Sequence, residues 1–212
     1  MRDGALVIAG AAIAALVLWG RRAAGAANNP TGEVTYLPPR ETWYPSPEPS
    51  AGITFADQVS ALLWAIRLSE HSRADVESGR DYYTLTGGGT FSDTSDHPAE
   101  TGEFAGIPVG GGLRSYAAGA YQITRDTWRQ FREAGSWGPR LEDFGPESQD
   151  TVTLRILKTD GALDALAAGD FDRTIAIAGR RWASLPGSPL PGRKRSFDEL
   201  VGFYTEGLPE VA

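Results

Sequence analysis

The sequence contains one acidic residue whose position predicts acid–base chemistry. Glu70 lies four positions after Ile66 and eight after Leu62, so the three side chains share one face of a helix. Partial burial on that face and the negative end of the helix dipole both raise the pKa of such a carboxyl. A carboxyl that stays protonated near neutral pH can act as a general acid toward a glycosidic oxygen. The alternative is a surface glutamate at a frayed helix end that pairs with His71 or Arg73.

Other kinds of catalytic centre are poorly represented in the chain. It has no cysteine, which excludes disulfides, thiolate catalysis and cysteine-bound metals. Glu70, Asp93, Asp96 and His97 offer an alternative metal site, but the two histidines lack the H-E-x-x-H spacing of a zinc enzyme. We therefore expect no metal and no cofactor. The formal net charge of -7 gives no global basic field for nucleic acid.

Helix signals recur along the part of the chain that would position Glu70. Thr54 is a suitable cap for a helix that runs to about Glu70. Ser196 begins a capping box, S-F-D-E, and Gly207 is a natural stop for the helix that follows it. Further helices are expected to begin near Thr124, at Gly145–Pro146, and at Asp170, the last running to about Ser184.

The stretch between residues 80 and 115 is rich in Gly, Thr and Ser and predicts loops with a small hairpin. Its strand candidates are residues 82–84 and 90–92. We expect residues 51–212 to form one folded domain of mainly α-helical α+β class. Residues 23–50 are rich in proline and predict a semi-rigid extended linker before it.

Residues 1–22 predict a single membrane anchor helix. Residues 4–20 carry no charge, and at ~1.5 Å per residue they span ~25 Å, slightly less than a ~30 Å hydrocarbon core. Trp19, Arg21 and Arg22 are placed like interfacial anchors. A cleaved signal peptide, with its cleavage site in residues 23–27, is the alternative. The positive-inside rule places the two arginines in the cytoplasm, which conflicts with export of the residues that follow.

Five segments carry a resemblance to a known family. They are L-S-E-H-S around Glu70, F-S-D-T-S-D-H-P at 91–98, A-G-A-Y-Q-I at 118–123, F-G-P-E-S-Q-D at 144–150 and W-A-S-L-P-G at 182–187. In this order and at these spacings the chain resembles the phage lambda endolysin family over residues 58–207. The resemblance implies a lysozyme-like fold with a small β-hairpin region.

The family resemblance also implies a reaction. Members are lytic transglycosylases, which cleave the bond between N-acetylmuramic acid and N-acetylglucosamine in peptidoglycan and leave a 1,6-anhydro end. Glu70 matches the catalytic glutamate. The candidate substrate-binding residues, matched to segments beside the family's cleft or added as a nearby carboxylate, are Tyr121, Gln122, Trp182, Ser184, Leu185, Pro186 and Asp93.

The chain departs from the family pattern at three places. His71 and Ser72 follow Glu70 where glycine and threonine are usual, and Ala120 stands where an arginine is common. After Gly187 the chain reads S-P-L-P-G-R-K-R and lacks an expected aromatic residue. These departures bear on substrate contacts rather than on the catalytic glutamate.

Two alternative functions remain open. A hydrolytic lysozyme needs a second carboxylate ~5 to 9.5 Å from the first, for which Asp93 and Asp96 are candidates, although Asp96 before His-Pro is also typical of a turn brace. A catalytically inactive, membrane-anchored wall-binding subunit is the other alternative, and retention of Glu70, Tyr121 and Gln122 argues against it.

The expected partners are peptidoglycan glycan strands and, through residues 4–20, a lipid bilayer. The expected location is a single-pass membrane anchor with the catalytic domain on the periplasmic side, or a phage virion. The sequence does not distinguish a phage lysis enzyme from a virion component or a housekeeping enzyme, and it indicates no oligomeric state.

Overall fold

The computed structural model describes residues 52–210 of the chain. The expected anchor helix at residues 1–22 and the linker at 23–50 lie outside this part. Within residues 52–210, no helix is long and apolar enough to cross a membrane. The elements are α2 (Phe55–Glu70), α3 (Arg73–Ser78), η2 (Arg80–Tyr83), α4 (Pro98–Thr101), β1 (Ile107–Gly110), β2 (Leu113–Ser115), α5 (Arg125–Arg132), α6 (Pro146–Thr159), α7 (Ala162–Ala167), α8 (Phe171–Ala178) and α9 (Phe197–Gly207).

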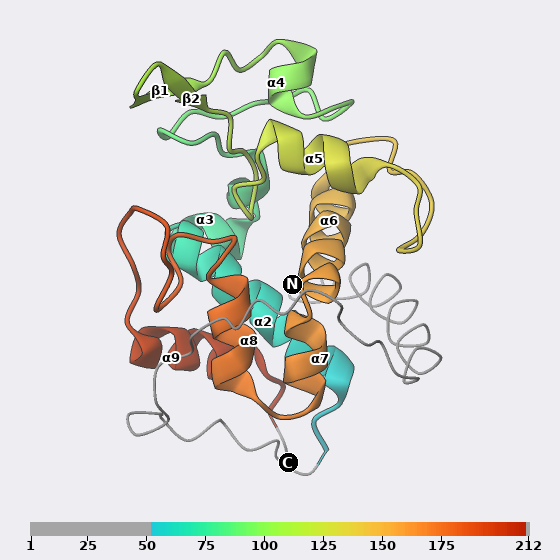
Figure 1. Ribbon diagram of the computed structural model, residues 1–212, viewed down its shortest axis with the longest axis vertical. Helices are drawn as coiled ribbons and strands as arrows, with labels where there is room; N and C mark the ends of the chain where they lie inside the picture. Colours follow the sequence, from blue (N-terminus) through green and yellow to red (C-terminus); the bar gives the residue numbers. More distant parts are fainter. Residues whose placement is uncertain (1–51, 211–212) are drawn as a thin grey trace, which may run out of the picture.

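The helix α6 runs between two groups of elements (Figure 1). Helices α2, α7, α8 and α9 lie together at one end, where α2 packs against both α7 and α9. Helices α4 and α5 and the two strands lie at the other end, and α5 packs against α6. The fold is therefore mainly helical with one small antiparallel sheet, as expected for a lysozyme-like α+β domain.

The helix that ends at Glu70 forms as the sequence predicts. Thr54 caps α2 with a capping box, in which its hydroxyl accepts from Asp57 N at 3.2 Å and its own N–H donates to the Asp57 carboxylate at 2.8 Å. His71 N donates to Arg67 O at 2.9 Å and closes the last turn. The helix starts expected near Thr124, at Asp170 and at Ser196 are confirmed as well, and each of these residues caps its helix.

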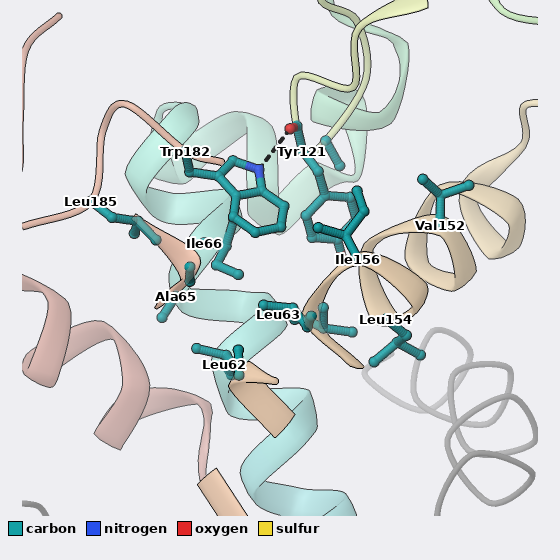
Figure 2. Packing of buried hydrophobic residues seen from close by; sticks show 14 of the residues in the cluster. Leu62, Leu63, Ala65, Ile66, Tyr121, Val152, Leu154, Ile156, Trp182 and Leu185 are labelled. Atoms are coloured by element: carbon teal, nitrogen blue, oxygen red, sulfur yellow. Dashed lines mark hydrogen bonds between the residues drawn. The ribbon is translucent and has the colours of Figure 1, made fainter. Parts of the chain in front are cut away.

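One face of α2 supplies the centre of the core. Leu62, Ala65 and Ile66 are fully buried, and Leu63 nearly so. Figure 2 shows these side chains meeting residues from α6 and from the two loops that contain Tyr121 and Trp182. Burial of this stripe fixes the rotation of α2 about its axis, because each large aliphatic side chain contributes about 1.5–3 kcal/mol when removed from water. The same rotation sets the direction in which Glu70 projects.

The hairpin expected at residues 82–84 and 90–92 forms only in part. Residues 82–83 belong to the 3₁₀ helix η2, and of the two expected strands only an isolated bridge between Thr84 and Thr90 forms. Phe91 N donates to Tyr83 O at 3.0 Å and Leu85 N to Gly89 O at 2.7 Å across the turn. On the other edge, Leu85 also bridges Ala118. The antiparallel pair is β1–β2, with Ile107 opposite Ser115.

The helix expected to reach Ser184 is shorter. Helix α8 ends at Ala178, after which Arg180 N and Arg181 N bond three residues back, to Ile177 O and Ala178 O. This tighter turn redirects the chain so that Trp182 points toward the loop that contains Tyr121.

Candidate active site

Glu70 is the last residue of α2, and its side chain is half-buried. Its Oε1 accepts a hydrogen bond of 2.5 Å from the hydroxyl of Ser184, which lies in the loop after α8. Burial raises the pKa of Glu70 above its ordinary value, while the Ser184 hydrogen bond and the charge of Arg195 act in the opposite direction. The result is a carboxyl that holds its proton more tightly than an exposed glutamate and has a partner for its charged form.

His71 ties the end of α2 to the segment that contains the predicted Tyr–Gln pair. Its ring is buried, and Nε2 lies 3.1 Å from Gly119 O, which can only accept, so the proton is on Nε2. Burial lowers the pKa of His71, which favours the neutral ring. Gln122 also donates to Gly119 O, through Nε2 at 3.1 Å. The backbone of Gln122 is left-handed, with φ 47°. One carbonyl therefore connects Glu70's neighbour with Gln122.

Tyr121 connects the same segment to the core. Its hydroxyl donates to Asp150 Oδ1 at 2.6 Å, and the hydroxyl of Tyr82 donates to the same oxygen at 2.8 Å. Its carbonyl accepts from Trp182 Nε1 at 2.9 Å (Figure 2). Burial raises the pKa of Asp150. The bond to Trp182 holds the segment after α8, and Ser184 with it, close to the Tyr–Gln segment.

Three of the expected substrate-binding side chains have almost no accessible surface. The exposed fractions are 1% for Tyr121, 5% for Trp182 and 0% for Leu185. Gln122, Ser184 and Pro186 are only partly buried, and Asp93 is exposed. The three buried side chains thus support the segments on either side of Glu70. The partly buried and exposed side chains are the ones that can touch a ligand directly.

The turn before Tyr121 depends on a glycine and a buried amide. Gly119 has φ +76°, and a Cβ built on it would lie 2.0 Å from Gln149 Oε1. Gln149 is fully buried in α6, accepts from Ala120 N at 2.9 Å and donates to Tyr82 O and Phe144 O, each at 2.9 Å. The side chain of Gln149 therefore occupies the place that a side chain at position 119 would need.

The two aspartates considered as second carboxylates have other partners. Asp96 accepts from Trp128 Nε1 at 2.6 Å, Arg132 Nη1 at 2.5 Å and its neighbour His97 N at 2.7 Å. Burial alone would raise the pKa of Asp96, but these donors hold it below its ordinary value. The carboxylate of Asp93 accepts from Ser95, which lowers its pKa. Asp96 thus braces the region between the 91–98 segment and α5.

The alternative metal site has no gathered ligand set. His97 uses both ring nitrogens within the protein, Nε2 at 3.0 Å from Ile123 O and Nδ1 as acceptor from Ala99 N at 3.2 Å. In the portion from 52 to 210, no three His, Asp or Glu side chains come together as a metal site would require.

Sequence reasoning missed two residues that hold this region together. Gln149 stands in the quoted F-G-P-E-S-Q-D segment, whose polar residues carried no assigned role. Arg195 stands in the S-P-L-P-G-R-K-R segment, which drew notice only for a missing aromatic residue. A buried polar residue in a family motif was the available signal for Gln149, whereas no local pattern pointed to Arg195.

Comparisons with known proteins identify the family of this chain. A sequence model described as Endolysin matches residues 60–211. The endolysin of Escherichia phage lambda is 34% identical over 152 residues, which cover 71% of this chain and 90% of that protein. The endolysin of Escherichia phage P2 is 37% identical over 111 residues, covering 52% and 65%.

Solved structures of phage lambda lysozyme share the fold. The structure in complex with a chitohexasaccharide has a TM-score of 0.59 at 31% identity, covering 71% of this chain and 94% of that one. A second lambda lysozyme structure has a TM-score of 0.56 at 30% identity. With a family match over well more than half its length and a lysozyme-like fold, this chain belongs to the endolysin family.

Proposed function

We propose that the protein degrades peptidoglycan as a lytic transglycosylase and that Glu70 is its acid–base catalyst. The half-buried position of the Glu70 carboxyl against Ser184 is the observation that carries this proposal. A lysozyme whose solved structure holds a chitohexasaccharide supports a glycan strand as the substrate.

The reaction needs one group that gives a proton and then takes one. Glu70 protonates the bridging oxygen as the C1–O bond to N-acetylglucosamine breaks. The carboxylate formed accepts the proton of the C6 hydroxyl of N-acetylmuramic acid, whose oxygen bonds to C1 and closes a 1,6-anhydro ring. Burial favours the neutral form that begins the cycle, and Ser184 stabilises the anionic form in its middle.

The surrounding residues divide into two roles. We assign direct contacts with the sugar strand to Gln122, Ser184 and Pro186, with Asp93 as a more distant candidate, because their side chains retain accessible surface. The buried side chains expected to bind substrate, which are Tyr121, Trp182 and Leu185, instead support the backbone on which those contacts depend.

Hydrolysis by the same fold is the second candidate. The observation that favours it is Asp93, an exposed carboxylate whose hydrogen bonding lowers its pKa and keeps it ionised. The engagement of Asp96 by a tryptophan and an arginine disfavours that residue as a nucleophile or base.

Product analysis separates these functions. Purified full-length protein is incubated with peptidoglycan sacculi, and the soluble fragments are identified by mass spectrometry. Transglycosylation predicts 1,6-anhydro ends, hydrolysis predicts reducing ends, and a wall-binding subunit binds sacculi without releasing fragments. Glu70→Gln should lower the rate by about 10²–10⁴-fold. Glu142→Gln, at an exposed glutamate, is the matched control and should retain activity. Undiminished release by Glu70→Gln would contradict the assignment.

For the biological setting, we propose a phage lysis enzyme held at the inner membrane by residues 4–20. A virion-associated enzyme is the alternative, and the two differ in whether the protein is found in purified virions.

A further inference from the structure

We propose that Arg195 is a positioning residue for Glu70, joining the last turn of α2 to the Ser184 segment and keeping a cation beside the carboxyl. The catalytic meaning of this inference rests on the proposed function, whereas the physical coupling can be measured without any substrate.

The contacts of Arg195 reach both segments that supply the Glu70–Ser184 pair. Its backbone N–H donates to Ser184 O at 2.7 Å. Its Nη2 donates to Leu68 O at 3.0 Å. Leu68 is two residues before Glu70, and its carbonyl is among the last four of the helix, which have no partner within the helix itself. A cation on such a carbonyl also interacts favourably with the helix dipole.

Arg195 is itself held in place by α9, which begins two residues later. Its guanidinium lies 5.6 Å from the ring centroid of Phe203 and its Nη1 lies 3.5 Å from Glu199 Oε1. Its side chain is 26% exposed, so solvent screens its charge only in part. One residue therefore connects α2, the loop after α8 and α9 at the point where Glu70 projects.

Arg195 differs from the cations near it in sequence or in the fold, because they have other partners. The positive charge of Arg195 lowers the pKa of Glu70 against the effect of burial, and Glu199 is the acid that faces Arg195. Arg73, close in sequence, is paired with Glu206 and Glu77 instead. The neighbouring Lys194 turns its Nζ to Leu190 O at 2.8 Å, within the loop.

This arrangement suits a group that must pass through its charged form. Burial favours protonated Glu70, but burial alone would leave the carboxylate unsupported once the proton has moved to the leaving oxygen. A fixed cation stabilises that charge as it develops and requires no reorganisation at the moment of reaction. Arg195 and Ser184 thus oppose burial from two sides, and Arg195 also fixes where Ser184 lies.

The direct test is a ¹³C NMR titration of the Glu70 carboxyl in the full-length protein, with the signal assigned by its loss in Glu70→Gln. In Arg195→Gln the titration midpoint should move to higher pH, whereas Arg195→Lys, which keeps the charge, should move less. Arg193→Gln, an exposed arginine of the same loop, is the matched control and should leave the midpoint unchanged. An unchanged midpoint in Arg195→Gln, or equal shifts in the Gln and Lys variants, overturns the inference.

A second variant guards against misfolding of Arg195→Gln, which thermal denaturation would reveal. Glu199→Gln keeps the acceptor of the capping box but removes the acid that competes for Arg195. The Glu70 midpoint should then move to lower pH, and an unchanged or raised midpoint counts against the inference.

Kinetics provide the link to catalysis. Arg195→Gln should lower the maximal rate of fragment release roughly tenfold, the equivalent of one hydrogen bond to a charged group. It should also move the alkaline limb of the pH–rate profile to higher pH, which a general loss of stability would not do. If the protein releases no fragments, the proposed function is wrong. The NMR titration midpoints of Glu70 would still test the role of Arg195.

Discussion

At the scale of single residues, Glu70 combines a functional benefit with a stability cost. Its folded-state pKa is raised above the ordinary 4.5, so the folded protein holds this proton more tightly than the unfolded chain. The contribution to stability is therefore full below pH 4.5 and is lost as the pH rises through the raised folded value. Carboxylates placed for acid catalysis commonly act against the stability of their own fold.

Glu70→Gln should consequently stabilise the protein although it lowers the rate of cleavage by about 10²–10⁴-fold. We expect an increase of ~1 kcal/mol at pH 8, typical in size for one substitution, and a smaller increase at pH 5, where the wild-type carboxyl retains more of its proton. Thermal or urea denaturation at the two pH values measures both differences. A gain that is the same at pH 5 and pH 8 would show that the carboxyl is not desolvated as described.

Asp96 should prove to be structural. Asp96→Ala removes the acceptor of Trp128 and Arg132 and should destabilise the fold by about 2–4 kcal/mol, because both donors stay buried. Its folded pKa lies below the ordinary 3.8, so this contribution is present above pH 3.8 and is lost on further acidification. Asp93→Ala is the exposed control, expected within ±0.5 kcal/mol. A changed product end in Asp96→Ala, measured on sacculi, would instead indicate a hydrolytic role.

Prediction of single functional residues from the sequence depended on the helical spacing of nearby apolar residues. Glu70 was a candidate because it continues the apolar stripe of Leu62 and Ile66 along one helix, and the family resemblance implied its catalytic role. Arg195 could not, because its partner Leu68 lies far away in the chain and no periodic pattern connects them.

At the scale of elements, capping residues predicted the helix starts reliably, whereas the pairing of segments far apart in the chain was not predicted reliably. The starts at Thr54 and Ser196 follow from side-chain bonds within three residues. The hairpin around the Gly-rich turn at residues 87–89 forms only in part, because residues 82–83 belong to η2, and its first arm also pairs with residues 117–119. Pairing with a distant segment is decided by packing that a single sequence does not display.

Two glycines test the description of the turn before Tyr121. Gly119 and Gly169 have nearly equal φ angles, +76° and +74°, but of the two only Gly119 has an atom in the way of a Cβ. Gly169→Ala should cost about 1–2 kcal/mol from backbone strain alone. Gly119→Ala should cost about 2 kcal/mol more, since Gln149 must move and give up buried hydrogen bonds. Equal losses in urea denaturation would contradict the close contact.

At the scale of the whole molecule, α6 joins the two groups of elements and carries the polar side chains that fix their relation. Asp150 accepts from Tyr82 and Tyr121, and Arg67 of α2 lies over the ring of Tyr82 at 4.4 Å and pairs with buried Asp81. A buried charge that loses one partner is strongly destabilised, so this network resists sliding of one group against the other.

The N-terminal residues make a separate prediction about the whole chain. If residues 4–20 insert into a bilayer, full-length protein should sediment with inner membranes and resist extraction by 1 M salt, whereas a chain lacking residues 1–22 should remain in the supernatant. Alkaline carbonate washing distinguishes insertion from surface adsorption. Recovery of full-length protein in the soluble fraction, with its N-terminus intact by mass spectrometry, would contradict the anchor.

The contact between Gly119 and Gln149 has an evolutionary consequence. The Gln149 amide occupies the space that a side chain at position 119, 30 residues earlier in the chain, would need. Neither position is therefore free to vary alone. Homologues that carry any side chain at position 119 should carry a shorter residue at position 149, and another polar group should replace the lost amide donor to the Tyr82 and Phe144 carbonyls. Correlated substitutions at positions 119 and 149 in a family alignment would be evidence of this constraint.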